Sequence, residues 1–289
     1  MKIFSNDKKG WGKMEIRYLS DPERYKTLGT WELRKNYLLE NLFAPGEIRM
    51  VYTDLDRAIV GAAVPRDLPL ALHAGEELAS QYFAERREIG VVNIGEKGMI
   101  KVDETVYTLE NCDFLYIGRG SKEVEFASEM SNNPAQFYFV SYPAHAQYPV
   151  THAPLSQGDM TPLGSVAESN RRTIYKMIHP NGIKSCQLVM GLTVLDMGCV
   201  WNTMSPHTHE RRTEVYLYFD LPEKSLVFHF MGAPRETRNI VVRDRQVVLS
   251  PSWSIHAGAG TKNYKFIWAM GGENQEFSDM DSVKTEGIF

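Results

Sequence analysis

The sequence predicts an all-β protein built from two tandem antiparallel β-barrels of the jelly-roll kind, with a few short helices. Short runs rich in β-branched and aromatic residues follow one another along the chain, and residues typical of turns separate them. The same texture occurs in both halves of the chain, whereas segments with helical signals are few. These observations together favour an all-β fold over a mixed one.

The first half of the chain alternates strand and turn signals. Hairpin turns are expected at 95–98 and 102–104, where Gly, Asp and Glu separate alternating segments. Helices are expected at Pro22–Thr27, Thr30–Glu40 and Ala74–Ala79. The predicted strands are Glu47–Tyr52, Arg57–Ala62, Ile89–Asn93, Gly98–Val102, Thr105–Leu109, Asp113–Ile117 and Glu123–Ala127.

The second half repeats this pattern after a segment of different composition. Residues 141–165 are rich in Pro, His, Gly and Ser, which is typical of a connection between two units. We therefore expect one domain at 1–150 and a second at 151–289. The predicted strands of the second domain are Ser185–Leu195, Glu214–Phe219, Ser225–Met231, Arg238–Val242, Gln246–Leu249 and Tyr264–Met270.

Composition excludes several classes of function. The 289 residues are 43% hydrophobic and 24% charged, which suits a soluble globular protein. A net charge of -4 and a pI near 6.1 give no basic field for nucleic acid, and no apolar run is long enough to cross a membrane. The start of the chain shows no secretory signal, and three cysteines without a Cys-x-x-Cys pair suit a reducing compartment. The cytoplasm is the expected location.

A cluster of metal-binding residue types lies in the second half. His207 and His209 alternate as residues on one face of a strand do, Glu214 follows, and His256 lies on a later predicted strand after a Pro-containing turn. Three imidazole nitrogens and one carboxylate oxygen suit zinc, manganese or iron(II), with a further coordination position open to water or substrate. A His-x-His pair alone is equally typical of a solvated strand face, so the prediction depends on Glu214 and His256.

An internal repeat places this cluster in the second unit only. Glu-Arg-Arg motifs precede predicted strands at 85–88 and at 210–214. When the two halves are aligned on them, Tyr82, Ala84 and Lys122 stand where the second half has histidines. The first unit is therefore expected to keep the strand plan without the ligands.

Five segments strongly resemble the 5-keto-4-deoxyuronate isomerase family of the cupin superfamily, and the resemblance runs from about Tyr37 to Asp281. It implies a bicupin fold, a homo-hexamer, and one zinc held by the residues numbered here His207, His209, Glu214 and His256. It also implies interconversion of 5-dehydro-4-deoxy-D-glucuronate and 3-deoxy-D-glycero-2,5-hexodiulosonate, a step in the breakdown of unsaturated uronates from pectin. The segments start at Tyr82, Ser169, Trp201, His207 and Ser250.

Two features depart from the general cupin pattern. Trp253 replaces the glycine that follows the proline of the second motif, and Gly260 lies near the place of a late asparagine. The amino-terminal segment Met1–Asn36 has no clear counterpart, so the resemblance implies no role for it.

Ketol isomerisation moves a proton between adjacent carbons through an enediolate, so it needs charge stabilisation and a proton carrier. The catalytic residue is left open among Glu214, Tyr216 and Tyr218. A guanidinium is the best partner for the carboxylate of a sugar acid, although paired arginines are often surface ion pairs. The arginine candidates for binding substrate are Arg171, Arg172, Arg211 and Arg212.

Other functions stay open on the residues alone. The alternatives are isomerisation of another sugar acid such as 5-deoxyglucuronate, a non-catalytic sugar-binding bicupin, and an iron-dependent dioxygenase. Metal identity separates the last of these, because zinc is redox-inactive.

Overall fold

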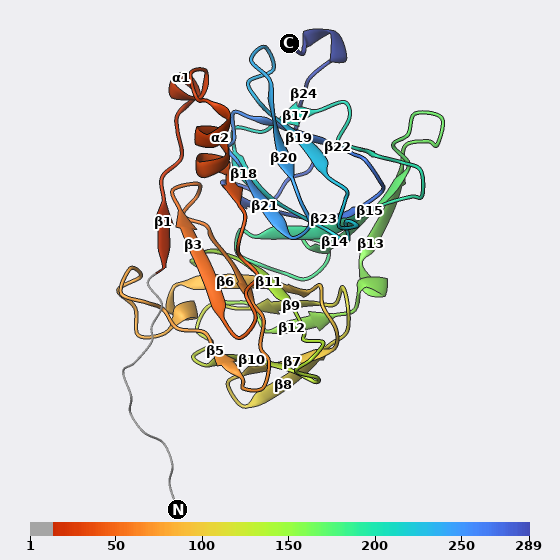
Figure 1. Cartoon of the computed structure of the whole chain (residues 1–289). Coiled ribbons are helices and arrows are strands. Elements are labelled where there is room, and N and C mark those ends of the chain that lie inside the picture. The colour runs from red at the N-terminus through yellow and green to blue at the C-terminus, as the bar shows by residue number, and fades with distance from the viewer. Residues whose placement is uncertain (1–13) are drawn as a thin grey trace, which may run out of the picture.

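The computed structural model describes residues 14–289, and strands dominate it (Figure 1). The first large sheet has seven strands, and a four-stranded sheet packs with it to form the first barrel. In spatial order the large sheet contains β1 (Glu15–Arg17), β3 (Ile48–Thr53), β4 (Ile59–Ala63), β11 (Phe137–Pro143), β6 (Arg87–Asn93), β9 (Phe114–Ile117) and β12 (Thr151–Ala153). The small sheet contains β5 (Leu70–Ala71), β10 (Val124–Ser128), β7 (Gly98–Val102) and β8 (Thr105–Leu109).

The second barrel has the same plan. Its seven-stranded sheet contains β13 (Asp159–Leu163), β14 (Arg172–Ile178), β15 (Val189–Leu195), β23 (Lys265–Gly272), β18 (Arg212–Phe219), β21 (Gln246–Ser250) and β2 (Leu38–Leu39). Its small sheet contains β16 (Trp201–Asn202), β22 (Ile255–Gly260), β19 (Val227–Gly232) and β20 (Arg238–Val242). A two-stranded sheet pairs β17 (His207–Thr208) with β24 (Asp281–Ser282) at the top of Figure 1.

Each large sheet ends on a short strand from the other side of the predicted domain boundary at residue 150. β12 follows that boundary yet pairs with β9 of the first barrel. β2 precedes it yet pairs with β21 of the second barrel. The division into 1–150 and 151–289 stays a prediction, and these two strands lie across it.

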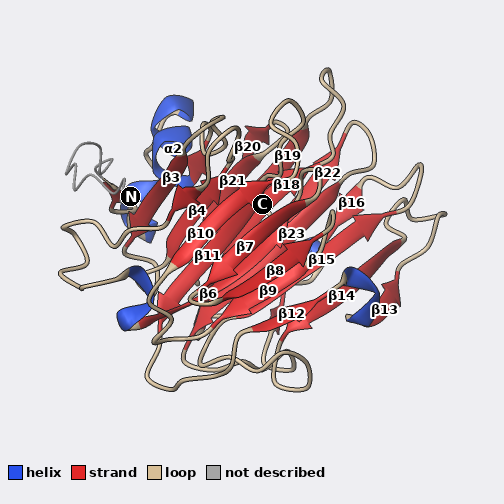
Figure 2. Ribbon diagram, turned by 90° about the horizontal axis from the view of Figure 1, so that it is seen from below, coloured by secondary structure: helices blue, strands red, loops and turns tan. Residues whose placement is uncertain are grey.

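The helices are short and lie at the periphery, while the strands of the stacked sheets run in broadly one direction (Figure 2). α1 (Pro22–Tyr25) and α2 (Thr30–Tyr37) form where the sequence predicts them, but α2 ends early because Leu38–Leu39 joins the second large sheet as β2. The helix expected at 74–79 is wrong. Positive φ values at Gly75 and Ala79 bracket a single turn there. Three 3₁₀ turns complete the helical elements: Phe83–Glu85, Leu155–Gln157 and Thr285–Gly287.

The connection expected at 141–165 is also more structured than the sequence suggests. It includes the end of β11, all of β12 and β13, and a 3₁₀ turn. Its prolines stand near strand ends or on β13, an edge strand, where a missing N–H is tolerated.

Three apolar clusters form the core. One lies between the two large sheets and joins the barrels, since it draws residues from both. A second fills the first barrel with side chains such as Ile89, Phe126 and Phe139. The third lies in the second barrel and includes Tyr25 and Tyr37, so the amino-terminal helices pack on that barrel.

A buried carboxylate ties the barrels together. Glu88 of β6 is fully buried and accepts hydrogen bonds from the backbone nitrogens of Cys186, Gln187 and Leu188 at 2.6, 2.8 and 2.8 Å. The hydroxyl of Tyr116 donates a fourth at 2.7 Å. Because these backbone groups belong to the loop that precedes β15, this one side chain fixes the second barrel against the first.

Within residues 14–289, no helix is long and apolar enough to cross a membrane. Residues 1–13 of the segment Met1–Asn36, including most of the stretch inspected for a secretory signal, lie outside the described residues.

Candidate metal centre and adjoining cavity

Four side chains that can bind metal converge inside the second barrel. One ligand atom from each of His207, His209, Glu214 and His256 lies within 4.8 Å of the others. The Nε2 atoms of His207 and His256 are 2.9 Å apart, and Glu214 Oε2 lies 3.1 Å from Nε2 of both His209 and His256. Ligand atoms of a tetrahedral zinc site with bonds of about 2.0–2.1 Å stand roughly 3.3 Å apart. The four donors are thus spaced to hold a single ion.

Two strand pairings and a turn position these ligands. β17 carries His207 and pairs with β24, while His209 follows β17 and begins a turn closed by the Arg212 N–H, which donates to the His209 carbonyl at 3.1 Å. Glu214 lies on β18, in the middle of the large sheet between β21 and β23. His256 lies on β22 of the opposing small sheet. The ion site therefore spans both sheets of the barrel.

The protonation of the imidazoles suits metal binding. Burial lowers the pKa of His207 and brings that of His256 well below its ordinary value, which keeps both rings neutral. Burial also lowers the pKa of His209, but the hydrogen bond and negative charge of Glu214 outweigh it and the net pKa is raised. His209 Nδ1 lies 2.8 Å from the carbonyl oxygen of Arg212, which places the proton on Nδ1 and leaves Nε2 facing the cluster.

A cavity of about 220 Å³ lies beside the cluster and includes two of its ligands in its walls. The polar lining residues are Arg172, Lys176, Thr193, Thr203, Ser205, His207, Glu214 and Tyr216. The remaining lining residues are Leu163, Ile174, Phe266, Trp268, Met270, Phe277 and Met280. A mostly apolar wall with a few converging polar groups is typical of a small-molecule site.

The two candidate tyrosines differ in position. Tyr216 lines the cavity, and its hydroxyl hydrogen-bonds with Thr203 and Glu214. Burial, reinforced by the charge of Glu214, raises the pKa of Tyr216 well above its ordinary value, so the phenol stays protonated. The Tyr218 hydroxyl instead lies 2.7 Å from Nδ1 of His229 and is absent from the cavity lining.

Two of the four candidate arginines are neighbours with different surroundings. Arg172 lines the cavity, whereas Arg171 is exposed and pairs with Asp196 outside it. Arg172 Nη1 donates to the carbonyl oxygen of Asn170 at 2.8 Å. No carboxylate among residues 14–289 forms an ion pair with Arg172.

The other two candidate arginines bind the C-terminal strap, which we define as residues 273–282. Arg212 is 1% exposed and donates to the Asp279 carboxylate at 2.8 and 3.0 Å. Arg211 pairs with Asp279 at 3.3 Å and with Asp281 at 2.9 Å. Neither arginine lines the cavity, but the strap they hold contributes Phe277 and Met280 to its wall.

Sequence reasoning missed two polar residues of this region. Lys176 lines the cavity, pairs with Asp159 at 3.3 Å and lies over the ring of Phe277 at 5.4 Å. Its two-residue alternation with Arg172 along β14 was a usable signal, but β14 was not predicted as a strand. His229 is fully buried against Tyr218, and burial lowers its pKa to about 3. The sequence holds no signal that separates it from the other scattered histidines.

The first barrel has an apolar interior at the corresponding place. Arg87 and Arg212 are the buried first residues of β6 and β18. Two residues further along, Glu214 binds into the cluster, whereas Ile89 packs in the apolar core of the first barrel. Within residues 14–289 the cluster in the second barrel is the single group of this kind.

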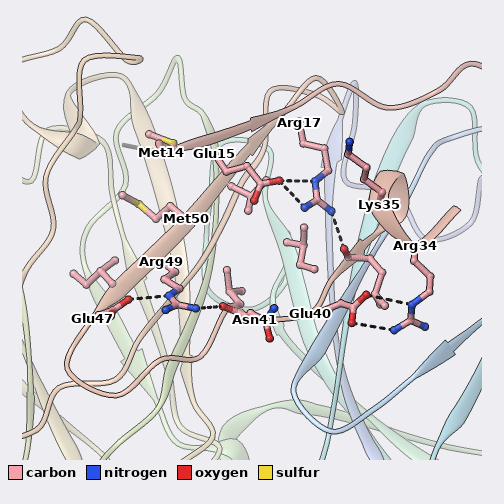
Figure 3. Close-up of a pocket in the computed structure, with 15 residues that line it drawn as sticks. Met14, Glu15, Arg17, Arg34, Lys35, Glu40, Asn41, Glu47, Arg49 and Met50 are labelled. Atoms are coloured by element: carbon pink, nitrogen blue, oxygen red, sulfur yellow. Dashed lines mark hydrogen bonds and ion pairs between the residues drawn. The ribbon is translucent and has the colours of Figure 1, made fainter. Parts of the chain in front are cut away.

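A larger cavity of about 570 Å³ lies elsewhere, between β1, β3 and the end of α2 (Figure 3). Its charged lining is internally paired: Arg17 with Glu15, Arg34 with Glu40 and Arg49 with Glu47. These exposed pairs satisfy one another and leave little charge to recognise a ligand.

Comparison with known proteins identifies the family of this chain. The family model described as the KduI/IolB family matches residues 38–285, most of the chain. The chain belongs to the KduI/IolB family. Two relatives named 4-deoxy-L-threo-5-hexosulose-uronate ketol-isomerase are each 56% identical to it. The one from Caldicellulosiruptor bescii matches over 93% of this chain and 98% of its own, and the one from Halalkalibacterium halodurans over 95% and 100%.

Solved structures extend the KduI/IolB assignment to the fold. An IolB-like protein from Salmonella typhimurium superimposes with a TM-score of 0.70 at 12% identity, covering 86% of this chain and 97% of that chain. Oxalate decarboxylase from Bacillus subtilis gives a TM-score of 0.56 at 12% identity, covering 83% and 77%. At such identities the likeness concerns the fold alone, and it confirms the predicted all-β bicupin architecture.

Proposed function

We propose that this protein is a metal-dependent ketol-isomerase that interconverts 5-dehydro-4-deoxy-D-glucuronate and 3-deoxy-D-glycero-2,5-hexodiulosonate. The observation that carries the proposal is the His207, His209, Glu214 and His256 cluster in the wall of a cavity, in a chain 56% identical to ketol-isomerases over nearly its whole length. The reaction serves the breakdown of unsaturated uronates such as those from pectin.

The cluster fits a divalent cation, and we propose zinc, one per chain. Three imidazole nitrogens and one carboxylate oxygen form a donor set that zinc prefers, although manganese and iron(II) accept it too. A bound cation would stabilise the negative charge that develops on the two substrate oxygens during isomerisation. Burial of His209, Glu214 and His256 keeps bulk water from competing at these atoms.

For proton transfer, we propose that Tyr216 supplies the hydrogen-bond donor nearest the reacting carbons. Its hydroxyl reaches both the cavity and the Glu214 carboxylate, and its raised pKa keeps the proton on the oxygen until the substrate needs it. Glu214 lies within hydrogen-bond reach and is the nearest carboxylate that could take a proton from carbon. Tyr218 is set aside because its hydroxyl is committed to His229.

A single assay tests this function. The protein is purified with its native metal, zinc, manganese and iron are quantified by elemental analysis, and conversion of 5-dehydro-4-deoxy-D-glucuronate is followed by NMR with and without chelator. Conversion that stops as about one zinc per chain is removed supports the proposal. Iron without conversion points to a dioxygenase, and zinc without conversion points to another sugar acid such as 5-deoxyglucuronate.

We also propose a homo-hexamer in the cytoplasm, acting on a free sugar acid without nucleic-acid or membrane partners. Mass measurement by light scattering and cell fractionation test these points.

A further inference from the structure

The cavity beside the cluster contains one cationic side chain without an anionic partner. Lys176, also in its wall, is already neutralised by Asp159 at 3.3 Å and covered by the Phe277 ring. Arg172 makes one hydrogen bond, to the Asn170 carbonyl oxygen, and pairs with no carboxylate among residues 14–289. Its other guanidinium donors are thus free to bind a ligand in the cavity.

The surroundings of Arg172 make that lack of a partner costly. Burial lowers the pKa of Arg172, against which the neighbouring Tyr216 and Tyr264 act in the opposite direction. A guanidinium taken out of water without a counter-ion destabilises a protein unless a ligand supplies one. A planar guanidinium also binds a carboxylate through two parallel hydrogen bonds, a geometry that an ammonium cannot match.

Arg172 and the metal cluster lie on opposite sides of Tyr216. Arg172 comes from β14, which is separated from β18 by β15 and β23 in the large sheet. Tyr216 of β18 hydrogen-bonds with Glu214 of the cluster and interacts electrostatically with Arg172. All three residues line the same cavity. The cavity therefore has a cationic end and a metal-binding end with a phenol between them.

We propose that Arg172 binds the carboxylate of the sugar-acid substrate and so sets the direction in which the substrate lies. The carbons that exchange their carbonyl and hydroxyl then lie at the metal cluster, next to Tyr216. The same contact selects sugar acids over neutral sugars, because a neutral sugar leaves Arg172 without a counter-ion. The identity of the reacting end rests on the proposed function, whereas the preference for an acid does not.

The test compares Arg172→Gln and Arg172→Lys with the matched control Arg171→Gln. Arg171 is the adjacent residue but pairs with Asp196 outside the cavity. The readouts are kcat and KM for the uronate, metal content, melting temperature, and inhibition by D-glucuronate against D-glucose. We expect Arg172→Gln to lower kcat/KM about 10- to 100-fold, mainly through KM, with metal and melting temperature unchanged. The control stays within about twofold of the wild type.

The competition experiment measures binding rather than turnover. Wild-type protein is inhibited more strongly by D-glucuronate than by D-glucose, and Arg172→Gln loses this difference. Equal inhibition of the wild type by both sugars, or kcat/KM of Arg172→Gln within about threefold of the wild type, would overturn the proposal.

If Arg172→Gln fails to fold, Arg172→Lys decides, and an unchanged KM in that variant contradicts bidentate binding. If the wild type prefers the acid through Arg172 yet converts no uronate, the proposed function fails and this inference stands.

Discussion

Removing the carboxylate of Asp279 is predicted to destabilise the metal-binding segment from outside the cavity. Asp279 accepts hydrogen bonds from Arg212 at 2.8 and 3.0 Å, from Asn274 at 2.9 Å and from Arg211 at 3.3 Å. Arg211 and Arg212 lie between the ligands at 209 and 214. Asp279 therefore joins the C-terminal strap to the chain segment that carries half of the cluster.

The magnitude follows from the burial of Arg212. Removing the partner of a buried ion costs about 3–5 kcal/mol. The Asp279 side chain is 25% exposed and Asn274 keeps its bond to Arg212, so we expect Asp279→Ala to lower the free energy of unfolding by about 2–3 kcal/mol. Loosening of residues 209–212 should also weaken metal affinity by about tenfold.

The effect should depend on pH in a defined direction. Hydrogen bonds from Arg212 and Asn274 hold the pKa of Asp279 well below its ordinary range in the folded state. A depressed folded pKa contributes stability above the unfolded value of about 3.9 and loses it as pH falls further toward the folded value. The difference between wild type and Asp279→Ala should therefore be full at neutral pH and shrink below about pH 4.

Urea unfolding at several pH values and metal titration measure these quantities. Asp196→Ala is the matched control, because Asp196 pairs with the exposed Arg171, and we expect it to cost less than about 1 kcal/mol. Equal losses in the two variants, or a loss that does not change with pH, would refute the reasoning about the buried Arg212.

Three further perturbations give distinct outcomes. His207→Ala should abolish metal binding and turnover together while far-UV circular dichroism stays unchanged; retained zinc with full turnover would contradict the ligand assignment. Glu88→Ala should lower the free energy of unfolding by about 3–5 kcal/mol, because buried N–H donors lose their acceptor, and urea unfolding checks this against Glu88→Gln, which should lose less. Gly258→Ala would place a Cβ 2.8 Å from Asn202 Nδ2 and 3.0 Å from the Tyr218 oxygen, so we expect a cost of about 1–3 kcal/mol in thermal unfolding.

The metal-binding residue types were predictable because their spacing is local. His207, His209 and Glu214 lie within one hairpin segment, and the parity of a strand was enough to suggest convergence. Their expected geometry was only partly right, since β17 ends at Thr208 and a turn, rather than the strand, orients His209. The roles of these residues in binding metal stay a proposal.

Features that depend on distant contacts were not predictable in this way. The strap reaches Arg212 from far along the chain, and no local pattern reports that contact. β2 is two residues long and follows helical signals, so only its partner β21 defines it as a strand. The separation of Arg172 from the other three arginines also depends on the fold, because sequence shows four similar pairs and no partners.

The exchange of β2 and β12 between the large sheets bears on how this chain can be divided. A cut at residue 150 leaves the carboxy-terminal fragment without β2, α1 and α2, whose apolar side chains belong to its core. The amino-terminal fragment loses β12 and exposes the edge of β9. Separately expressed halves should therefore be poorly soluble alone and recover when mixed, as in fragment complementation, while the intact chain should melt in a single cooperative transition.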